Sequence, residues 1–270
     1  ATEAINLALS GLARPGATIV HGPLEHNAVM RPLTHLAQRH GWTTAQAPGD
    51  AFGRIDPAAL DAFLARTKAD VLITLQASNV HGLAQDLAAI GEICARREII
   101  FIVDAAQGGG LLPLDMDAMR IDALCLTGHK GLLGPTGTGA LLLSERGAER
   151  IEPLLLGGTG SASDKEDMPD FLPDRLEAGT PNTHGAAGLL AGVQYLLEET
   201  VEVAARYEAE LRTRMIDRLR ALKGVTIVGD APGPATATLG FTSPLAPSDM
   251  AFLLSEKYGV AVRAGLQCAP

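Results

Sequence analysis

The stretch Ile99-Ile100-Phe101-Ile102-Val103-Asp104 decides the fold class of this chain of 270 residues. Five apolar residues, four of them β-branched, run without interruption and end in an aspartate. An apolar run of this kind is typical of a strand buried on both faces, as in a parallel sheet covered by helices. The sequence therefore predicts an α/β fold built around this strand.

Shorter apolar runs before and after this stretch indicate further strands separated by helices. Strands are expected at residues 17–20, 71–75, 123–126 and 140–143. Val29, Leu33 and Leu36 share one face of a helix, and Asp56-Pro57 supplies an N-cap followed by proline at the first helical position. Strands that alternate with helices predict a mainly parallel sheet in a large domain.

The pattern changes in the last third of the chain. Apolar residues from Val193 to Leu222 form one stripe of a single long helix. It is followed by expected strands at 225–228, 236–241 and 260–262 and by a helix at 248–258. We therefore predict a large domain over residues 1–192, and a linking helix with a partial small α+β domain over residues 193–270.

The composition indicates which surfaces the protein is not expected to bind and in which compartment we expect it. The 22 Lys and Arg against 31 Asp and Glu give a formal net charge of −9, which disfavours a nucleic-acid or anionic-membrane surface. Apolar runs are far shorter than the about 20 residues of a membrane-spanning helix. Three cysteines cannot all pair, and a chain of this size needs no disulfide, so we expect the reducing cytoplasm.

One lysine follows an expected strand in Thr127-Gly128-His129-Lys130-Gly131. It would lie at the carboxyl edge of the sheet, where α/β proteins bind ligands. A lysine there can form a Schiff base. A lone lysine in a turn is more often a surface residue, so its neighbours decide the interpretation.

Three neighbouring strand ends also carry polar side chains. Asp104 ends its strand and can hold a pyridinium nitrogen protonated, which strengthens pyridoxal phosphate (PLP) as an electron sink. His26 stands at a helix start and can stack on a flat ring, and Asn79 follows the strand at 71–75. Each alone also fits a cap, a turn or a surface position. Four such residues at one sheet edge predict a site.

A phosphate would find partners at the same edge. Thr2 begins a helix, where backbone N–H groups and the helix dipole favour anions, and Thr127 and His129 can donate hydrogen bonds. The sequence holds no P-loop and no G-x-G-x-x-G after a strand. It also lacks H-E-x-x-H, C-x-x-C and G-x-S-x-G, so zinc hydrolases and α/β-hydrolases have no motif in their favour.

The three cysteines differ in their surroundings. Cys94 and Cys125 fall within apolar patterns and are expected in the core. Cys268 lies in a loop after an expected strand, with Arg263 five residues earlier, and a nearby cation favours a reactive thiolate. A cysteine hydrolase that pairs Cys268 with a histidine has only these residue types in its favour.

Seven motifs, in this order, resemble those of the fold-type I PLP enzymes of the class V aminotransferase family, and most closely its cysteine desulfurase branch. They are T-E-A-I-N, E-H-N-A-V, A-S-N-V-H-G, V-D-A-A-Q, T-G-H-K-G, R-L-E-A-G-T-P-N-T and V-R-A-G-L-Q-C-A-P. Any single motif can arise by chance, whereas the ordered set covers nearly the whole chain and is specific.

The resemblance implies a role for each candidate residue. It implies that Lys130 forms the Schiff base with PLP, that Asp104 pairs with the pyridine nitrogen and that His26, also a catalytic residue, stacks on the ring. Gln107 would bind the phenolic oxygen, and Asn79 would lie near that oxygen and the substrate carboxylate. The phosphate would be held by Thr2, Thr127 and His129. Cys268 would be the nucleophile that accepts sulfur.

The resemblance also implies partners and a reaction. Family members are homodimers, so the loop at 157–161 is expected to approach the partner's cofactor, with Thr159 as a phosphate contact. L-cysteine would be converted to L-alanine, with its sulfur held as a persulfide and passed to an acceptor protein. An aminotransferase, an epimerase or a selenocysteine lyase shares the Lys130 and Asp104 arrangement. A catalytically silent fragment or dimer scaffold is the alternative of another class.

The sequence departs from the family pattern at both ends. The family has a segment before the T-E-A motif, and a segment after C-A-P that carries an arginine for the substrate carboxylate. Neither stands in these 270 residues. Arg263 matches a different family position. We therefore expect the chain to be the middle of a longer enzyme.

Overall fold

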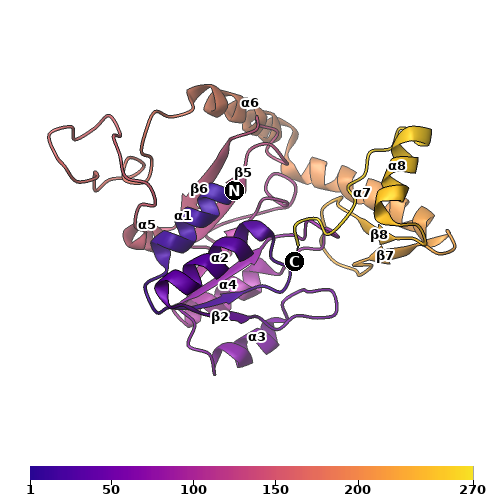
Figure 1. Ribbon diagram of the computed structural model, residues 1–270, viewed down its shortest axis with the longest axis horizontal. Coiled ribbons are helices and arrows are strands. Elements are labelled where there is room, and N and C mark those ends of the chain that lie inside the picture. The colour runs from indigo at the N-terminus through magenta and orange to yellow at the C-terminus, as the bar shows by residue number, and fades with distance from the viewer. Residues whose placement is uncertain (270) are drawn as a thin grey trace.

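A central sheet organises the computed structural model, which describes residues 1–269. The sheet has six strands in the order β2-β1-β3-β4-β5-β6 (Figure 1). They are β1 (Thr18–His21), β2 (Thr43–Gln46), β3 (Val71–Leu75), β4 (Ile100–Asp104), β5 (Ala123–Thr127) and β6 (Gly139–Leu143). All neighbours pair in parallel except β5 and β6. The predicted mainly parallel sheet is confirmed.

Helices cover both faces of this sheet. They are α1 (Thr2–Leu12), α2 (Asn27–His40), α3 (Pro57–Leu64), α4 (Leu87–Arg96) and α5 (Glu145–Arg150). Apolar side chains of α1 and α2 pack on one face, and those of α3 and α4 pack on the other. The helix predicted after Asp56-Pro57 is present, and the Asp56 carboxylate accepts a hydrogen bond from Ala59 N at 3.0 Å.

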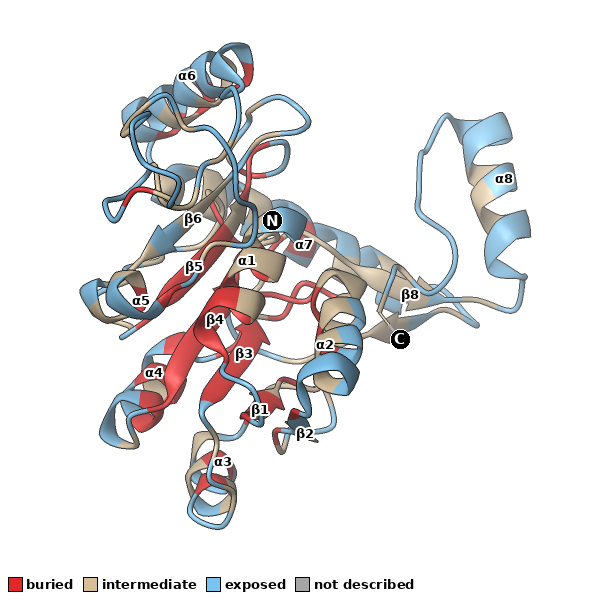
Figure 2. Ribbon diagram, turned by 60° about the vertical axis from the view of Figure 1, so that its left-hand side comes forward, coloured by how far each residue is buried: buried red, intermediate tan, exposed pale blue. Residues whose placement is uncertain are grey.

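Strand β4 is buried on both faces, as its sequence predicts. Ile100 and Ile102 join the core under α1 and α2, whereas Phe101 and Val103 join the core under α3 and α4. Figure 2 shows β3 and β4 buried along their length. Successive side chains of a strand point to opposite faces, so an uninterrupted apolar run fills both cores at once.

The second part of the chain is a smaller unit beside the sheet (Figure 1). It consists of α7 (Val201–Arg220), β7 (Thr226–Val228), β8 (Gly240–Thr242) and α8 (Pro247–Tyr258). It follows α6 (Thr183–Glu199), in which Gly192 packs against the backbone of Leu132 and Leu133 in the large domain. Strands β7 and β8 pair antiparallel. The predicted domain boundary at residue 192 falls within α6 and stays a prediction.

Three sequence-based expectations for this part are wrong. The single long helix is two helices, because Thr200 has φ +68° and interrupts the helical hydrogen bonds. The strand expected at 236–241 is confined to β8, because the Thr236 and Thr238 carbonyls accept from Arg212 instead. No strand forms at 260–262, where Val260 N donates to Leu254 O and so caps α8.

Two segments join the smaller unit to the sheet. Leu83 and Ala235 form an antiparallel bridge. Ala84 N donates to Pro234 O at 2.9 Å, and Thr236 N donates to Gly82 O at 3.0 Å. These bonds fix the smaller unit against the chain that follows β3. In residues 1–269, no helix has both the length and the apolarity needed to span a membrane.

We predict that Phe101→Ala destabilises the fold by about 3–5 kcal/mol, because the side chain is fully buried and its removal leaves a cavity. Phe252→Ala is the matched control, since Phe252 is 65% exposed, and we expect a change within about 0.5 kcal/mol. Urea unfolding of both variants measures the difference. Equal destabilisation by the two substitutions would contradict the position of β4 in the core.

Candidate active site

The carboxyl ends of β3, β4 and β5 and the start of α2 open onto one cavity of about 1210 Å³. Nine of the ten predicted site residues line it, namely Thr2, His26, Asn79, Asp104, Gln107, Thr127, His129, Thr159 and Lys130. They come from strand ends and helix starts that are far apart in the sequence. The parallel arrangement of the strands brings them together, as expected for this edge of an α/β sheet.

Asp104 supplies a buried carboxyl group at the end of β4. The residue is 5% exposed, and its Oδ1 accepts a hydrogen bond from Ala106 N at 2.9 Å. Burial raises the pKa of this carboxyl, while the Ala106 N–H and the positive charges of Lys130 and His26 act in the opposite direction. A carboxylate here is therefore stabilised by a cation in the cavity.

Lys130 is held in a tight turn between β5 and β6. Leu133 N donates to Lys130 O at 2.9 Å, and Gly128 N donates to Thr138 O at 2.9 Å. A Cβ at Gly128 would lie 2.0 Å from Thr138 Oγ1, and a Cβ at Gly131 would lie 2.3 Å from Gly109 O. Both glycines of the G-H-K-G sequence are thus required for the turn that presents the lysine.

His26 is the N-cap of α2. Its Nδ1 accepts a hydrogen bond from Ala28 N at 3.0 Å, which leaves the proton of the neutral ring on Nε2. Burial lowers the pKa of this imidazole, and the positive charges of Lys130 and Arg31 act in the same direction, whereas Asp104 opposes them. The ring is therefore favoured in its neutral form beside the cavity.

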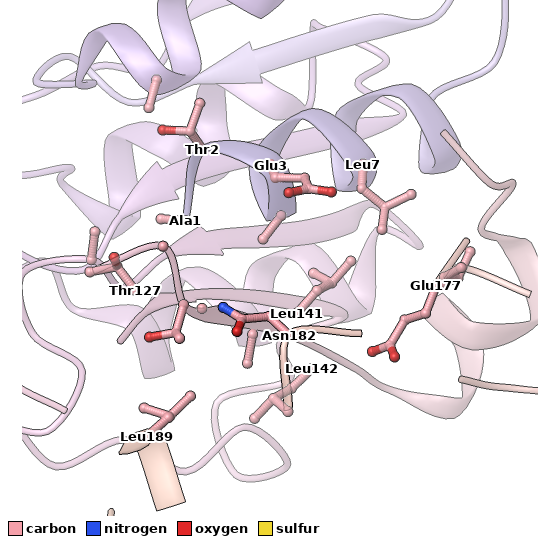
Figure 3. A pocket seen from close by; sticks show the side chains of 18 of the residues that line it. Ala1, Thr2, Glu3, Leu7, Thr127, Leu141, Leu142, Glu177, Asn182 and Leu189 are labelled. Carbon is pink, nitrogen blue, oxygen red and sulfur yellow. The ribbon is translucent and has the colours of Figure 1, made fainter. Parts of the chain in front are cut away.

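One part of the cavity wall has the donors of an anion site. Thr127 Oγ1 lies 3.1 Å from His129 Nδ1. Thr2 begins α1, and the N-cap Ala1 makes no side-chain capping bond, so N–H groups of the first turn stay free of a side-chain partner. Figure 3 shows Thr127 below Thr2 and Ala1, with Glu177 on the far side of the cavity.

Thr159 lies in the long loop before α6. Its hydroxyl is 3.0 Å from Ser161 Oγ, and Ser161 Oγ donates to the Asp174 carboxylate. The residue lines the cavity of its own chain. The expected contact with a partner's cofactor requires a second chain and stays a prediction.

Cys268 lies at the rim rather than in the cavity. Its side chain is exposed and is not part of the lining. Arg263, expected near the thiol, is exposed, and its carbonyl accepts from Gln267 Nε2 at 2.9 Å. Cys94 and Cys125 are buried as predicted, and burial raises the pKa of the Cys94 thiol to about 12. Pro270, the end of the last motif, is outside the described residues.

The family model described as Aminotransferase class-V matches residues 1–270. This chain belongs to the class V aminotransferase family. It is 33% identical to a probable cysteine desulfurase of Pyrococcus abyssi, with 99% of this chain and 68% of the relative covered. It is also 33% identical to the cysteine desulfurase IscS of Photobacterium profundum, with 99% and 63% covered.

Solved structures of the family share the fold. The apo cysteine desulfurase of Thermococcus onnurineus matches with a TM-score of 0.89 at 31% identity, over 99% of this chain and 68% of that one. The cysteine desulfurase CsdA of Escherichia coli matches with a TM-score of 0.85 at 30% identity, over 99% and 67%. The expected fold type I is confirmed. The chain spans about two thirds of the length of these family members.

A second buried carboxyl group, Glu25, was not singled out from the sequence. It is 3% exposed, its Oε1 accepts from Leu75 N at 3.1 Å, and its Oε2 has no partner among residues 1–269. Burial raises the pKa of Glu25 to about 8, the negative charge of Asp104 adds to this, and the Leu75 N–H opposes it. The E-H-N motif contains the residue, but nothing in the motif separates a buried glutamate from an exposed one.

We predict that Glu25→Gln removes a pH-dependent loss of stability. The folded chain keeps the proton until about pH 8, whereas the unfolded chain releases it near 4.5, so this group costs stability as pH rises between those values. The free energy of unfolding of the variant minus that of the wild type should rise by on the order of 2–4 kcal/mol from pH 5 to pH 7.5. Urea unfolding of both proteins at both pH values measures this difference. Exposed Glu92→Gln is the control. If the difference in the free energy of unfolding between variant and wild type is the same at both pH values, Glu25 is not protonated in the folded wild type.

Proposed function

We propose that this chain carries the cofactor site of a PLP-dependent cysteine desulfurase, which converts L-cysteine to L-alanine and transfers the sulfur to Cys268. One observation carries the proposal: Lys130 and the buried carboxyl of Asp104 line one cavity at neighbouring strand ends. Relatives named cysteine desulfurases match along 99% of the chain and support the choice of reaction.

The residues that line the cavity fit PLP chemically. Asp104 is a buried acid whose ionised form is favoured by a nearby positive charge, which suits a protonated ring nitrogen, and Asn79 Oδ1 is a buried acceptor with no partner in residues 1–269. We assign the ring to Asp104 and His26, the phenolic oxygen to Gln107, and the aldehyde carbon to Lys130. The phosphate is assigned to Thr2, Thr127 and His129. When bound, PLP supplies an electron sink for the charge that develops at the substrate Cα.

The chain's own groups then divide the remaining chemistry. The Lys130 amine accepts the proton from the substrate Cα and returns a proton to the carbon framework. The neutral His26 ring covers one side of the site and helps to exclude water. A protonated ring nitrogen bound to Asp104 would favour the ionised form of this carboxyl, whose pKa burial otherwise raises.

Cys268 takes the sulfur in this proposal. Its thiolate attacks the substrate sulfur, so that an S–S bond forms while the bond from sulfur to the substrate Cβ breaks. The bonding pair remains on the Cβ, which is protonated to give alanine. The thiol is exposed on the loop at the rim of this cavity.

We also propose that the protein works as a homodimer in the cytoplasm and passes sulfur to an acceptor protein. The dimer is supported by a run of exposed leucines, of which Leu156 is 74% exposed, in the loop that leads to Thr159. Apolar surface of this kind is typical of an interface between subunits. L-cysteine is the proposed small-molecule substrate.

The test measures alanine release from L-cysteine by the PLP-loaded protein. Lys130→Ala should abolish turnover and the absorbance of lysine-bound PLP. Cys268→Ala should keep that absorbance and lower alanine release by at least about 100-fold, because it removes only the nucleophile. Cys94→Ala is the matched cysteine control, since Cys94 lies in the core.

Three outcomes would overturn parts of this proposal. Undiminished alanine release by Cys268→Ala would contradict the persulfide step. Absence of PLP absorbance in the wild type would favour a catalytically silent scaffold. Faster turnover of selenocysteine, or of an amino acid without sulfur, would point to another enzyme of the same family.

A further inference from the structure

The loop that carries Cys268 is docked at the cavity rim by two hydrogen bonds. We call residues 263–269 the cysteine loop. Asn79 Nδ2 donates to Gln267 O at 2.6 Å, and Asn27 N donates to Cys268 O at 2.9 Å. Two consecutive carbonyl groups of the loop are therefore held by residues that are far earlier in the sequence. Figure 1 shows the C-terminal end returning from α8 toward the central sheet.

The Asn27 N–H group has no acceptor inside its own helix. Asn27 is the first residue of α2, and the first four N–H groups of an α-helix lack intrahelical partners. Cys268 O supplies the acceptor. Since His26 directly precedes Asn27, the peptide of Cys268 lies against the same helix start that holds the His26 ring.

The Asn79 side chain connects the cavity to the loop. It lines the cavity, and its Nδ2 is bonded to Gln267 O. Its Oδ1 is buried and has no partner among residues 1–269. An amide nitrogen carries two N–H groups, so a second donor also remains. A ligand in the cavity can thus bind the same side chain that holds the loop.

The loop backbone depends on these contacts. Gln267 has φ +56° and Cys268 has φ +58°, a left-handed conformation that costs residues with a side chain roughly 1 kcal/mol each. Two adjacent residues in this conformation persist when surrounding contacts hold them. The hydrogen bonds from Asn79, which follows β3, and from Asn27, which begins α2, hold the carbonyl groups of these two residues.

We propose that Asn79 is a positioning residue that latches the cysteine loop, and with it Cys268, to the rim of the cavity. The hydrogen bonds of the latch do not depend on the proposed function. Only the role of Cys268 as the sulfur acceptor rests on it. A ligand that binds the free atoms of the Asn79 amide fixes this side chain, and so strengthens docking of the loop. By linkage, a docked loop strengthens binding of that ligand by the same factor.

Hydrogen exchange of the Asn27 amide tests the latch directly, because that amide bonds to the loop and not to its own helix. Asn79→Asp keeps the shape of the side chain and removes the donor, and Asn79→Ala removes the whole amide. Both should raise exchange at Asn27 and at residues 266–269 by about 3- to 10-fold. Asn182→Ala is the control, because Asn182 lines the same cavity, caps α6 and does not bond to the loop.

The probe for coupling is PLP itself. In the wild type, PLP should slow exchange at Asn27, and in Asn79→Asp it should not. Unchanged Asn27 exchange in both Asn79 variants would overturn the latch, and so would an equal effect of Asn182→Ala. A chain that shows no PLP absorbance would contradict the proposed cofactor, while exchange in the free protein would still decide the latch.

Discussion

The burial of β4 on both faces is the constraint on which the rest of the structure depends. Ile100 and Ile102 fill one core and Phe101 and Val103 fill the other, so the strand has a single place, in the middle of the sheet. Asp104 ends the strand in register with Leu75 of β3 and lines the cavity with only 5% of its surface exposed. The apolar run thus positions the carboxyl group and also sets its surroundings.

Burial also affects which of the acidic groups near the site are ionised. Asp104 and Glu25 are both buried, and the negative charge of Asp104 adds to burial in raising the pKa of Glu25. Lys130 and His26 face Asp104 and favour its charge, whereas the Oε2 of Glu25 has no partner in the described part of the chain. The result is one carboxylate that is available to a cation and one carboxylic acid that holds the start of α2 to β3 through Leu75.

The sequence predicts those features that depend on local pattern. Strand β4 is a continuous apolar run up to Val103, and β5 is apolar up to Leu126, so Asp104 and Lys130 can be placed at the ligand-binding edge without a structure. The pattern does not predict strand β2, because Thr43–Gln46 is an edge strand with a single apolar residue. It does not predict the break at Thr200 either, because the apolar stripe continues across that residue. The burial of Glu25 and the docking of the cysteine loop depend on contacts between distant segments, which periodicity does not encode.

The most direct test of the central claim concerns the ring nitrogen that Asp104 is proposed to bind. PLP labelled with ¹⁵N at the pyridine position is added to the wild type and to Asp104→Asn, and the nitrogen chemical shift is measured by NMR near pH 8. The account predicts a protonated nitrogen in the wild type and an unprotonated one in the variant, because only the carboxylate stabilises the cation. An unprotonated nitrogen in the wild type, or the same shift in both proteins, would contradict it.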